Sequence, residues 1–138
     1  MRDLHIFVAQ RETRNLQSWQ QNEKMILDGN GFLVKLEYKG RTISYIFFSF
    51  NSTVALYFSS ATIRDYYKNL NNITHKSMYL AIKYLKNKSK FLYIGSQTLY
   101  SKNLLSEKEK NIEFYKKSFV SKKKNLYKTY IDISYSVS

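Results

Sequence analysis

The fold of this chain is decided by residues 32–60, FLVKLEYKGRTISYIFFSFNSTVALYFSS. Apolar and polar side chains alternate through its first part, and a two-residue period is typical of a β-strand. Lys39-Gly40 and Asn51-Ser52 are turn-forming pairs that separate this strand from two further ones. The stretch therefore predicts three consecutive strands, over residues 32–38, 41–50 and 53–60.

The middle of these strands carries Ile46, Phe47 and Phe48 in succession. Neighbouring residues of a strand point to opposite faces of its sheet, so three apolar residues in a row indicate a strand covered on both sides. We therefore expect the sheet to be flanked by helices.

Helical patterns stand on either side of this stretch. Apolar spacing predicts helices over residues 3–9 and 15–28, the second capped by Thr13 or Asn15. After the three strands, Thr74 is the expected N-cap of a helix with apolar residues at i, i+3, i+4 and i+7 from position 78.

The remaining segments complete the predicted order. Residues 91–94 form an apolar run that suits a buried strand beside a crossover helix. Ser106 and Glu109 form a capping-box pattern that begins a last helix, and residues 126–135 predict a closing strand. The sequence thus predicts one α/β (α+β) domain over residues 1–138, with the order α-α-β-β-β-α-β-α-β and a mixed, mostly antiparallel sheet.

Composition excludes several kinds of chemistry. The 138 residues contain no cysteine, which rules out disulfides, thiolate nucleophiles and zinc–sulfur sites. The two histidines, His5 and His75, are far apart in the sequence and lack an acidic cluster, so no metal site is expected. Neither a secretion signal nor a membrane span is apparent, and we expect a cytoplasmic protein.

The net charge of +13 is unevenly distributed. Residues 83–128 hold 13 lysines and three glutamates, a balance of +10 that leaves +3 for the rest of the chain. Such a surface attracts polyanions, including RNA. A bias toward lysine, asparagine, isoleucine and tyrosine also follows from AT-rich coding sequence whatever the function, so both explanations stay open.

Short motifs in a fixed order carry a resemblance to a known family. They are Leu4-His5 with Arg11-Glu12-Thr13-Arg14 and Trp19, then Tyr57-Phe58-Ser59-Ser60-Ala61, His75 with Ala81-Ile82-Lys83, Ile94-Gly95, and finally Tyr115-Lys116-Lys117-Ser118-Phe119. The set resembles the FemAB-like acyltransferase domains, which are GNAT-fold relatives of the Fem-type aminoacyltransferases. The resemblance implies a GNAT-like fold whose first strand is missing, corresponding to the C-terminal half of a two-domain protein.

The resemblance also implies a reaction. It is the transfer of an acyl or aminoacyl group from acyl-CoA or aminoacyl-tRNA to an amine of an amino sugar or peptidoglycan precursor. The donor acts as a co-substrate, and no permanently bound cofactor is expected. Residues 61–73 contain no glycine and therefore lack the phosphate-binding loop of acetyl-CoA-dependent relatives, so the choice between the two donors stays open.

Seven residues take roles in this hypothesis. Lys116 would polarise the reacting carbonyl and His75 would accept the amine proton, although each could equally serve as an ordinary residue at a helix end. The backbone at Ser59 and Ser60 would hold the carbonyl oxygen of the donor. The donor's phosphates would be bound by residues near the next helix, Arg64, Thr74 and Lys76.

Two other functions fit the same sequence. The chain could be a catalytically inactive GNAT-like module that binds RNA or a partner protein. It could also be a basic nucleic-acid-binding domain without acyl-transfer chemistry. A partner domain or a second copy of the chain could pair with the strand edge near Phe32.

Overall fold

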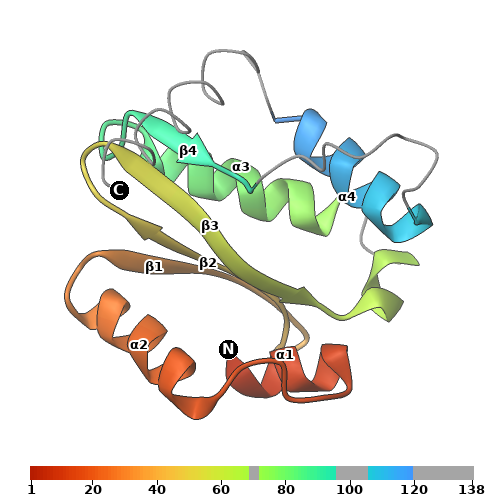
Figure 1. Ribbon diagram of the computed structural model, residues 1–138. Helices are drawn as coiled ribbons and strands as arrows, with labels where there is room; N and C mark the ends of the chain where they lie inside the picture. Colours follow the sequence, from red (N-terminus) through yellow and green to blue (C-terminus); the bar gives the residue numbers. More distant parts are fainter. Residues whose placement is uncertain (69–71, 96–105, 120–138) are drawn as a thin grey trace. The chain divides into compact units, whose positions relative to one another are not determined.

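The computed structural model describes residues 1–68, 72–95 and 106–119 (Figure 1). The chain divides into two units, Met1–Ile94 and Gly95–Ser138. The predicted closing strand, residues 126–135, lies outside the described residues. The expectation of a single domain stays a prediction.

The first unit contains most of the described secondary structure. In chain order its elements are helices α1 (Arg2–Ala9) and α2 (Leu16–Leu27), strands β1 (Gly31–Tyr38), β2 (Arg41–Phe50) and β3 (Val54–Thr62), the short 3-10 helix η1 (Arg64–Lys68), helix α3 (Ile73–Leu85) and strand β4 (Phe91–Tyr93). The described part of the second unit contains helix α4 (Glu107–Lys117).

The four strands form one mixed sheet in the order β1-β2-β3-β4. β1 pairs with β2 and β2 with β3 in antiparallel fashion, whereas β3 and β4 are parallel. A parallel pair requires a crossover connection, and α3 lies in that connection. The predicted mixed α/β architecture with a mostly antiparallel sheet is confirmed.

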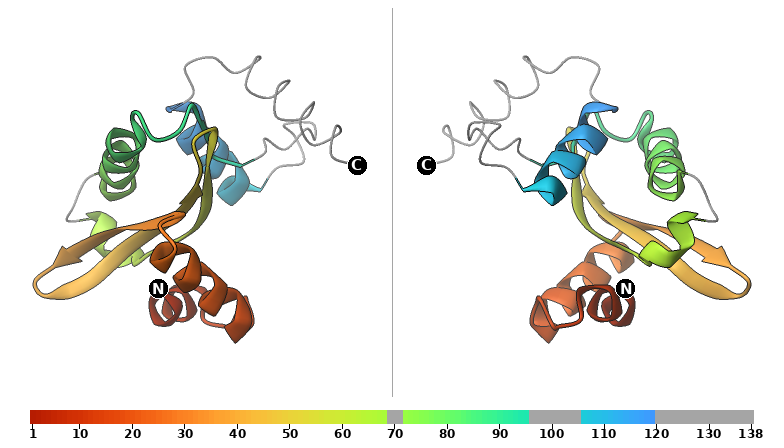
Figure 2. Two further views of the ribbon diagram at one scale, coloured as in Figure 1. Left: turned by 90° about the vertical axis from the view of Figure 1, so that its left-hand side faces the viewer. Right: turned by 90° about the vertical axis from the view of Figure 1, so that its right-hand side faces the viewer.

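Helices cover both faces of the sheet in the first unit, with α1 and α2 on one face and α3 on the other (Figures 1 and 2). Phe47 points toward α1 and α2, where it shares a core with Tyr45, Ala61 and side chains of both helices. Phe48 points the other way, stacks on Phe32 at 5.0 Å between ring centroids, and lies in the layer under α3. The expectation drawn from the consecutive apolar residues is confirmed.

Local chemistry explains how the elements begin and turn. Lys39 and Gly40 both have positive φ, as a tight two-residue hairpin requires. Asn15, one of the two predicted caps, accepts a hydrogen bond from the Ser18 backbone N–H at 2.9 Å at the start of α2. The Ser106–Glu109 capping box is present at the start of α4.

The expected N-cap of α3 was wrong. The helix begins at Ile73, so Thr74 lies inside its first turn rather than at the cap. The cap position is taken by Asn72 in the left-handed conformation, with φ of 63° and no side-chain hydrogen bond to the helix. Asparagine tolerates the left-handed conformation far better than β-branched threonine does. This preference suits Asn72, rather than Thr74, to the cap position that the chain adopts here.

Gly31 lies where α2 meets the sheet, and it leaves no room for a side chain. A Cβ atom there would stand 3.0 Å from Cε2 of Phe47 and 3.2 Å from the backbone carbonyl carbon of Met25. Both neighbours are fixed, because Phe47 is fully buried and Met25 is in helix α2. The glycine therefore sets how closely α2 approaches β1.

We predict that Gly31→Ala lowers the free energy of unfolding by roughly 1–3 kcal/mol, the usual cost of overpacking a core. Chemical denaturation of both proteins measures the difference. The matched control is Asn30→Ala at the neighbouring, exposed position. Equal stability of the Gly31→Ala variant and the unchanged chain would contradict the close packing described here.

Candidate functional site

Strand β3 extends well beyond its parallel partner. The β3–β4 ladder runs from Val54–Phe91 to Leu56–Tyr93 and ends there, whereas β3 continues to Thr62. Within the described residues, no strand pairs with residues 58–62 on the edge of β3 that faces β4. Backbone hydrogen-bonding groups on this edge are therefore left outside the sheet ladder.

The same part of β3 contains a β-bulge. Phe47 of β2 is opposite Ser59, and the next residue, Phe48, is opposite Tyr57, so Phe58 is an extra residue in β3. A bulge bends the strand and changes the direction of its side chains, and bulges are common beside active sites. Phe58 is partly exposed, and its carbonyl oxygen accepts a hydrogen bond from Arg14 Nη2 at 3.4 Å.

Ser59 and Ser60, predicted to bind the donor carbonyl through their backbone, directly follow this bulge. Ser59 is opposite Phe47 and is buried on the face covered by α1 and α2. Ser60, the next residue, points to the other face, where its hydroxyl accepts a hydrogen bond from the Tyr57 hydroxyl. The two predicted residues thus share one backbone segment but present their side chains to different layers.

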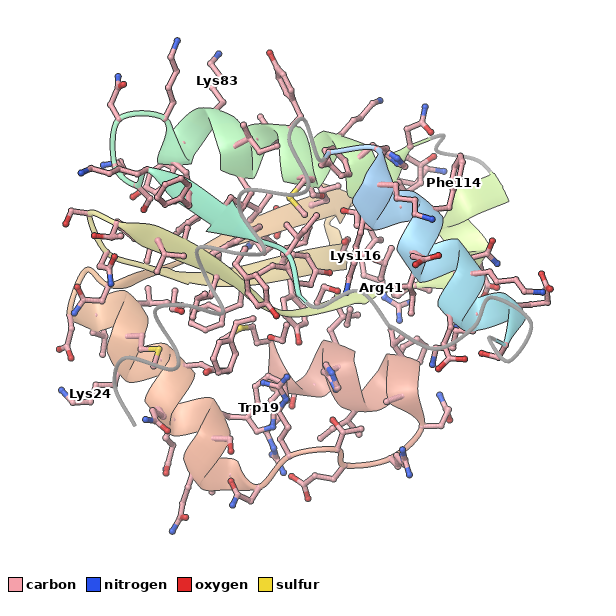
Figure 3. All side chains as sticks on the ribbon, turned by 45° about the horizontal axis from the view of Figure 1, so that its top comes forward. Trp19, Lys24, Arg41, Lys83, Phe114 and Lys116 are labelled. Atoms are coloured by element: carbon pink, nitrogen blue, oxygen red, sulfur yellow. The ribbon has the colours of Figure 1, made fainter. Side chains whose placement is uncertain are left out.

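Several buried or partly buried residues with polar groups lie on the face covered by α1 and α2. The guanidinium of Arg14 lies against two aromatic rings, 5.7 Å from the centroid of Trp19 and 5.4 Å from that of Phe58. Trp19 lies between α1 and α2 (Figure 3), and its ring meets the His5 ring edge-on at 5.3 Å. We call Arg14, Trp19, Asn22, Tyr45 and Ser59 the Arg14 cluster.

Four members of the Arg14 cluster have a buried polar side-chain atom, and each of these residues is at most 5% exposed. The Tyr45 and Ser59 hydroxyls lie close enough to interact with each other. Trp19 Nε1 and Asn22 Nδ2 have no hydrogen-bond partner among the described residues. Buried polar groups of native proteins nearly always have a partner, which can be an ordered water molecule.

The environment changes the pKa values of two residues here. Burial raises the pKa of Tyr45 to about 12, and the nearby Ser59 hydroxyl and Arg14 guanidinium oppose the rise. Burial, and secondarily the charge of Arg14, lowers the pKa of His5. Neutral forms of both side chains are therefore favoured in the folded chain.

The raised Tyr45 pKa makes folding stability depend on pH in the alkaline range. An unfolded tyrosine loses its proton near pH 10, whereas Tyr45 in the folded chain keeps it until about pH 12. The unfolded state therefore binds fewer protons in this interval, and stability falls as pH rises. We predict that the unchanged chain loses more stability between pH 9 and pH 11.5 than Tyr45→Phe does.

Denaturant unfolding at several pH values measures this difference. Tyr79→Phe is the control, because Tyr79 is 65% exposed on α3 and the substitution leaves Tyr45 in place. The control should follow the unchanged chain. Parallel pH profiles for Tyr45→Phe and the unchanged chain would contradict the buried, protonated hydroxyl.

The other predicted residues of the first unit lie after β3. Arg64 is exposed at the start of η1. In the first turn of α3, Thr74 and His75 are partly buried and Lys76 is exposed. The topology therefore places all four on the segment that leaves the end of β3 and enters the crossover helix.

Lys116 belongs to the second unit, in the last turn of α4. Its ammonium nitrogen lies 2.9 Å from the point where a Cβ atom of Gly95 would stand, and Gly95 has a φ of +90°. Only glycine combines that backbone conformation with space for the ammonium group. Partial burial lowers the pKa of Lys116. His75 lies in the first unit, so the two predicted catalytic residues belong to different units.

We predict that Lys116 loses its proton at a lower pH in the folded chain than in the unfolded chain, because burial disfavours its charged form. NMR titration of isotopically dimethylated lysines measures this, with Lys116→Arg identifying the signal. In Gly95→Ala the new methyl group should displace the ammonium into solvent and raise the pKa again. Asn111→Ala, at an exposed position of α4, is the control. Identical titration in folded and denatured protein would refute this prediction.

The described residues include no group of three or more histidine, aspartate or glutamate side chains that could hold a metal ion. None of the helices in the described ranges has both the length and the apolar character needed to cross a lipid bilayer. Comparison of the chain with protein-family models, curated proteins and solved structures found no match.

The Arg14 cluster is the feature that the sequence did not predict as a site. Arg14 and Trp19 belong to the motifs of the family resemblance, and Asn22 and Tyr45 are ordinary residues of a helix and a strand. The signal available in the sequence was an arginine between two predicted helices, close to the chain's single tryptophan. The register of β2 and β3 brings Ser59 close to Tyr45, and Arg14 lies against the rings of Trp19 and the bulge residue Phe58.

Proposed function

We propose that the chain is a GNAT-like N-acyltransferase that transfers an acyl or aminoacyl group from acyl-CoA or aminoacyl-tRNA to an amine. The observation that carries the proposal is the bulge at Phe58 on the part of β3 that extends past β4. Two further features support it: the crossover helix between two parallel strands, and the order of elements that leads to them.

The bulged edge suits the chemistry of acyl transfer. The amine nitrogen attacks the donor carbonyl carbon, the bond to the thiol or to the tRNA hydroxyl breaks, and the amine gives up a proton. Negative charge develops on the carbonyl oxygen during attack, and fixed backbone N–H groups are effective donors to it. Residues 58–62 are a backbone segment of this kind, because β4 ends before reaching them.

The acceptor proposed from the family resemblance is an amino sugar or a peptidoglycan precursor. Lys116 and His75 keep the roles proposed from the sequence, carbonyl polarisation and proton acceptance. The proposed role requires the protonated form of Lys116, and partial burial lowers the pKa of this side chain.

Transfer is tested by incubating the full chain with acetyl-CoA or with aminoacyl-tRNA, together with a series of amines, and detecting the amide product by mass spectrometry. We expect product with one donor class. Lys116→Ala should lower turnover roughly 100-fold, the typical cost of losing one donor to an oxyanion. Lys108→Ala, an exposed lysine on the same helix, should leave turnover unchanged.

Absence of product with both donors, together with no thermal shift by either donor, would refute the enzyme. RNA binding that weakens steeply with salt and gives no product would instead identify a non-catalytic binding module. Equal loss in the Lys116→Ala and Lys108→Ala variants would remove the specific role of Lys116 while leaving the reaction intact.

A further inference from the structure

We propose that two copies of this chain pair edge to edge through β1 and form one continuous sheet. β1 is the first strand of the sheet order, so one of its edges pairs with β2 and, within the described residues, no strand pairs with the other. The strand is eight residues long and contains no proline. An open edge of this kind is a template for pairing with another chain. The inference does not rest on the proposed function.

The hydrogen bonds between β1 and β2 identify the backbone groups that face the open edge. One position before the β1–β2 ladder begins, the Phe50 backbone N–H donates to the carbonyl oxygen of Asn30 at 2.8 Å. Residues of an antiparallel pair alternate between bonding to the neighbouring strand and pointing away from it. Even-numbered residues of β1 therefore bond to β2. The N–H and C=O groups of the odd-numbered residues point to the open edge, and these residues include Leu33, Lys35 and Glu37.

The two faces of β1 carry different side chains near this edge. Lys35 and Glu37 are exposed on the side of the sheet where α1 and α2 lie, and their charged groups are 2.8 Å apart. On the side of α3, Val34, Leu36 and Tyr38 are half-buried. One face of the strand thus presents a positive and a negative charge, and the other presents apolar side chains.

One two-fold register matches both faces. An axis perpendicular to the sheet through Leu36 places Lys35 of each copy opposite Glu37 of the other, and Val34 opposite Tyr38. Opposite charges and apolar side chains stabilise cross-strand pairs, whereas like charges destabilise them. An axis through Lys35 or Glu37 would set like charges opposite each other. An axis through Val34 would set Lys35 opposite an apolar side chain. The sequence of β1 is therefore complementary to itself around Leu36.

The same register pairs the open backbone groups. Lys35 and Glu37 both face the edge, so the two Lys35–Glu37 pairs would each exchange two backbone hydrogen bonds across the axis. The end of the β1–β2 hairpin extends beyond α1, α2 and α3 (Figure 2), so these helices do not cover that part of the edge. β4 lies at the other end of the sheet order, and pairing through β1 leaves residues 58–62 of β3 open.

The chain has no cysteine, so disulfide trapping can test the register directly. In the proposed dimer the two copies of Leu36 form a non-hydrogen-bonded pair with Cα atoms about 4.5 Å apart, within the range that a disulfide spans. We expect Leu36→Cys to form a covalent dimer on mild oxidation. Val34→Cys is the matched control on the same face, and it should stay monomeric. A mixture of Val34→Cys and Tyr38→Cys should form the mixed disulfide, because these positions are opposite each other.

Charge reversal tests the attraction across the edge. Sedimentation equilibrium measures the Kd of the dimer at physiological ionic strength, where the net charge of the chain is screened. Lys35→Glu should raise this Kd roughly 10-fold, because two cross-strand pairs then carry like charges. The double variant Lys35→Glu/Glu37→Lys should restore it. Lys24→Glu is the control, because it breaks an equally short ion pair on α2 and should leave the Kd unchanged.

Three results would overturn the proposal: a monomer at every concentration, a dimer whose Kd does not respond to Lys35→Glu, or trapping of Val34→Cys as readily as Leu36→Cys. The first would leave the edge to a strand of another protein, and the second would place the contact on a different surface. If Lys35→Glu does not fold, Glu37→Lys replaces it beside the same double variant. No acyl donor is present, so these results are independent of the transfer assay.

Discussion

The rest of the structure depends on the burial of β2 on both faces. Phe47 and Phe48 are adjacent residues with 0% exposure, and each belongs to a different layer. Phe47 anchors the layer that α1 and α2 complete, and Phe48, through Phe32, anchors the layer that includes Tyr84 of α3. Because one strand serves both cores, a shift of its register by one residue would exchange the two layers.

This constraint explains why the strands were predictable and the start of α3 was not. Alternation and turn residues specify strands locally, so Lys39-Gly40 was enough to set the β1–β2 hairpin. A helix cap depends on the conformation of the chain that enters the helix. Thr74 has a side chain suited to a cap, but the helix begins after Asn72, whose backbone is left-handed.

The candidate site could be predicted only in part for a similar reason. Ser59 and Ser60 were predicted as site residues at the end of a predicted strand, and in the structure they directly follow the bulge residue Phe58 of β3. The Arg14 cluster arises when the register of β2 and β3 brings Ser59 beside Tyr45, and when α2 lays Trp19 over the same face. No local pattern encodes this cluster, because its residues come from the α1–α2 connection, α2, β2 and β3, which assemble only in the folded chain.

The buried donors on this face also affect the stability of the fold. A buried polar group without a partner costs about 1–3 kcal/mol relative to one that is satisfied, which is a large fraction of the roughly 5–15 kcal/mol that stabilises a domain. Trp19 and Asn22 are both buried residues of α2, so this cost falls on a helix that completes the layer of Phe47. The apolar contacts that Met25 and Ile26 of the same helix make with that layer must therefore outweigh it.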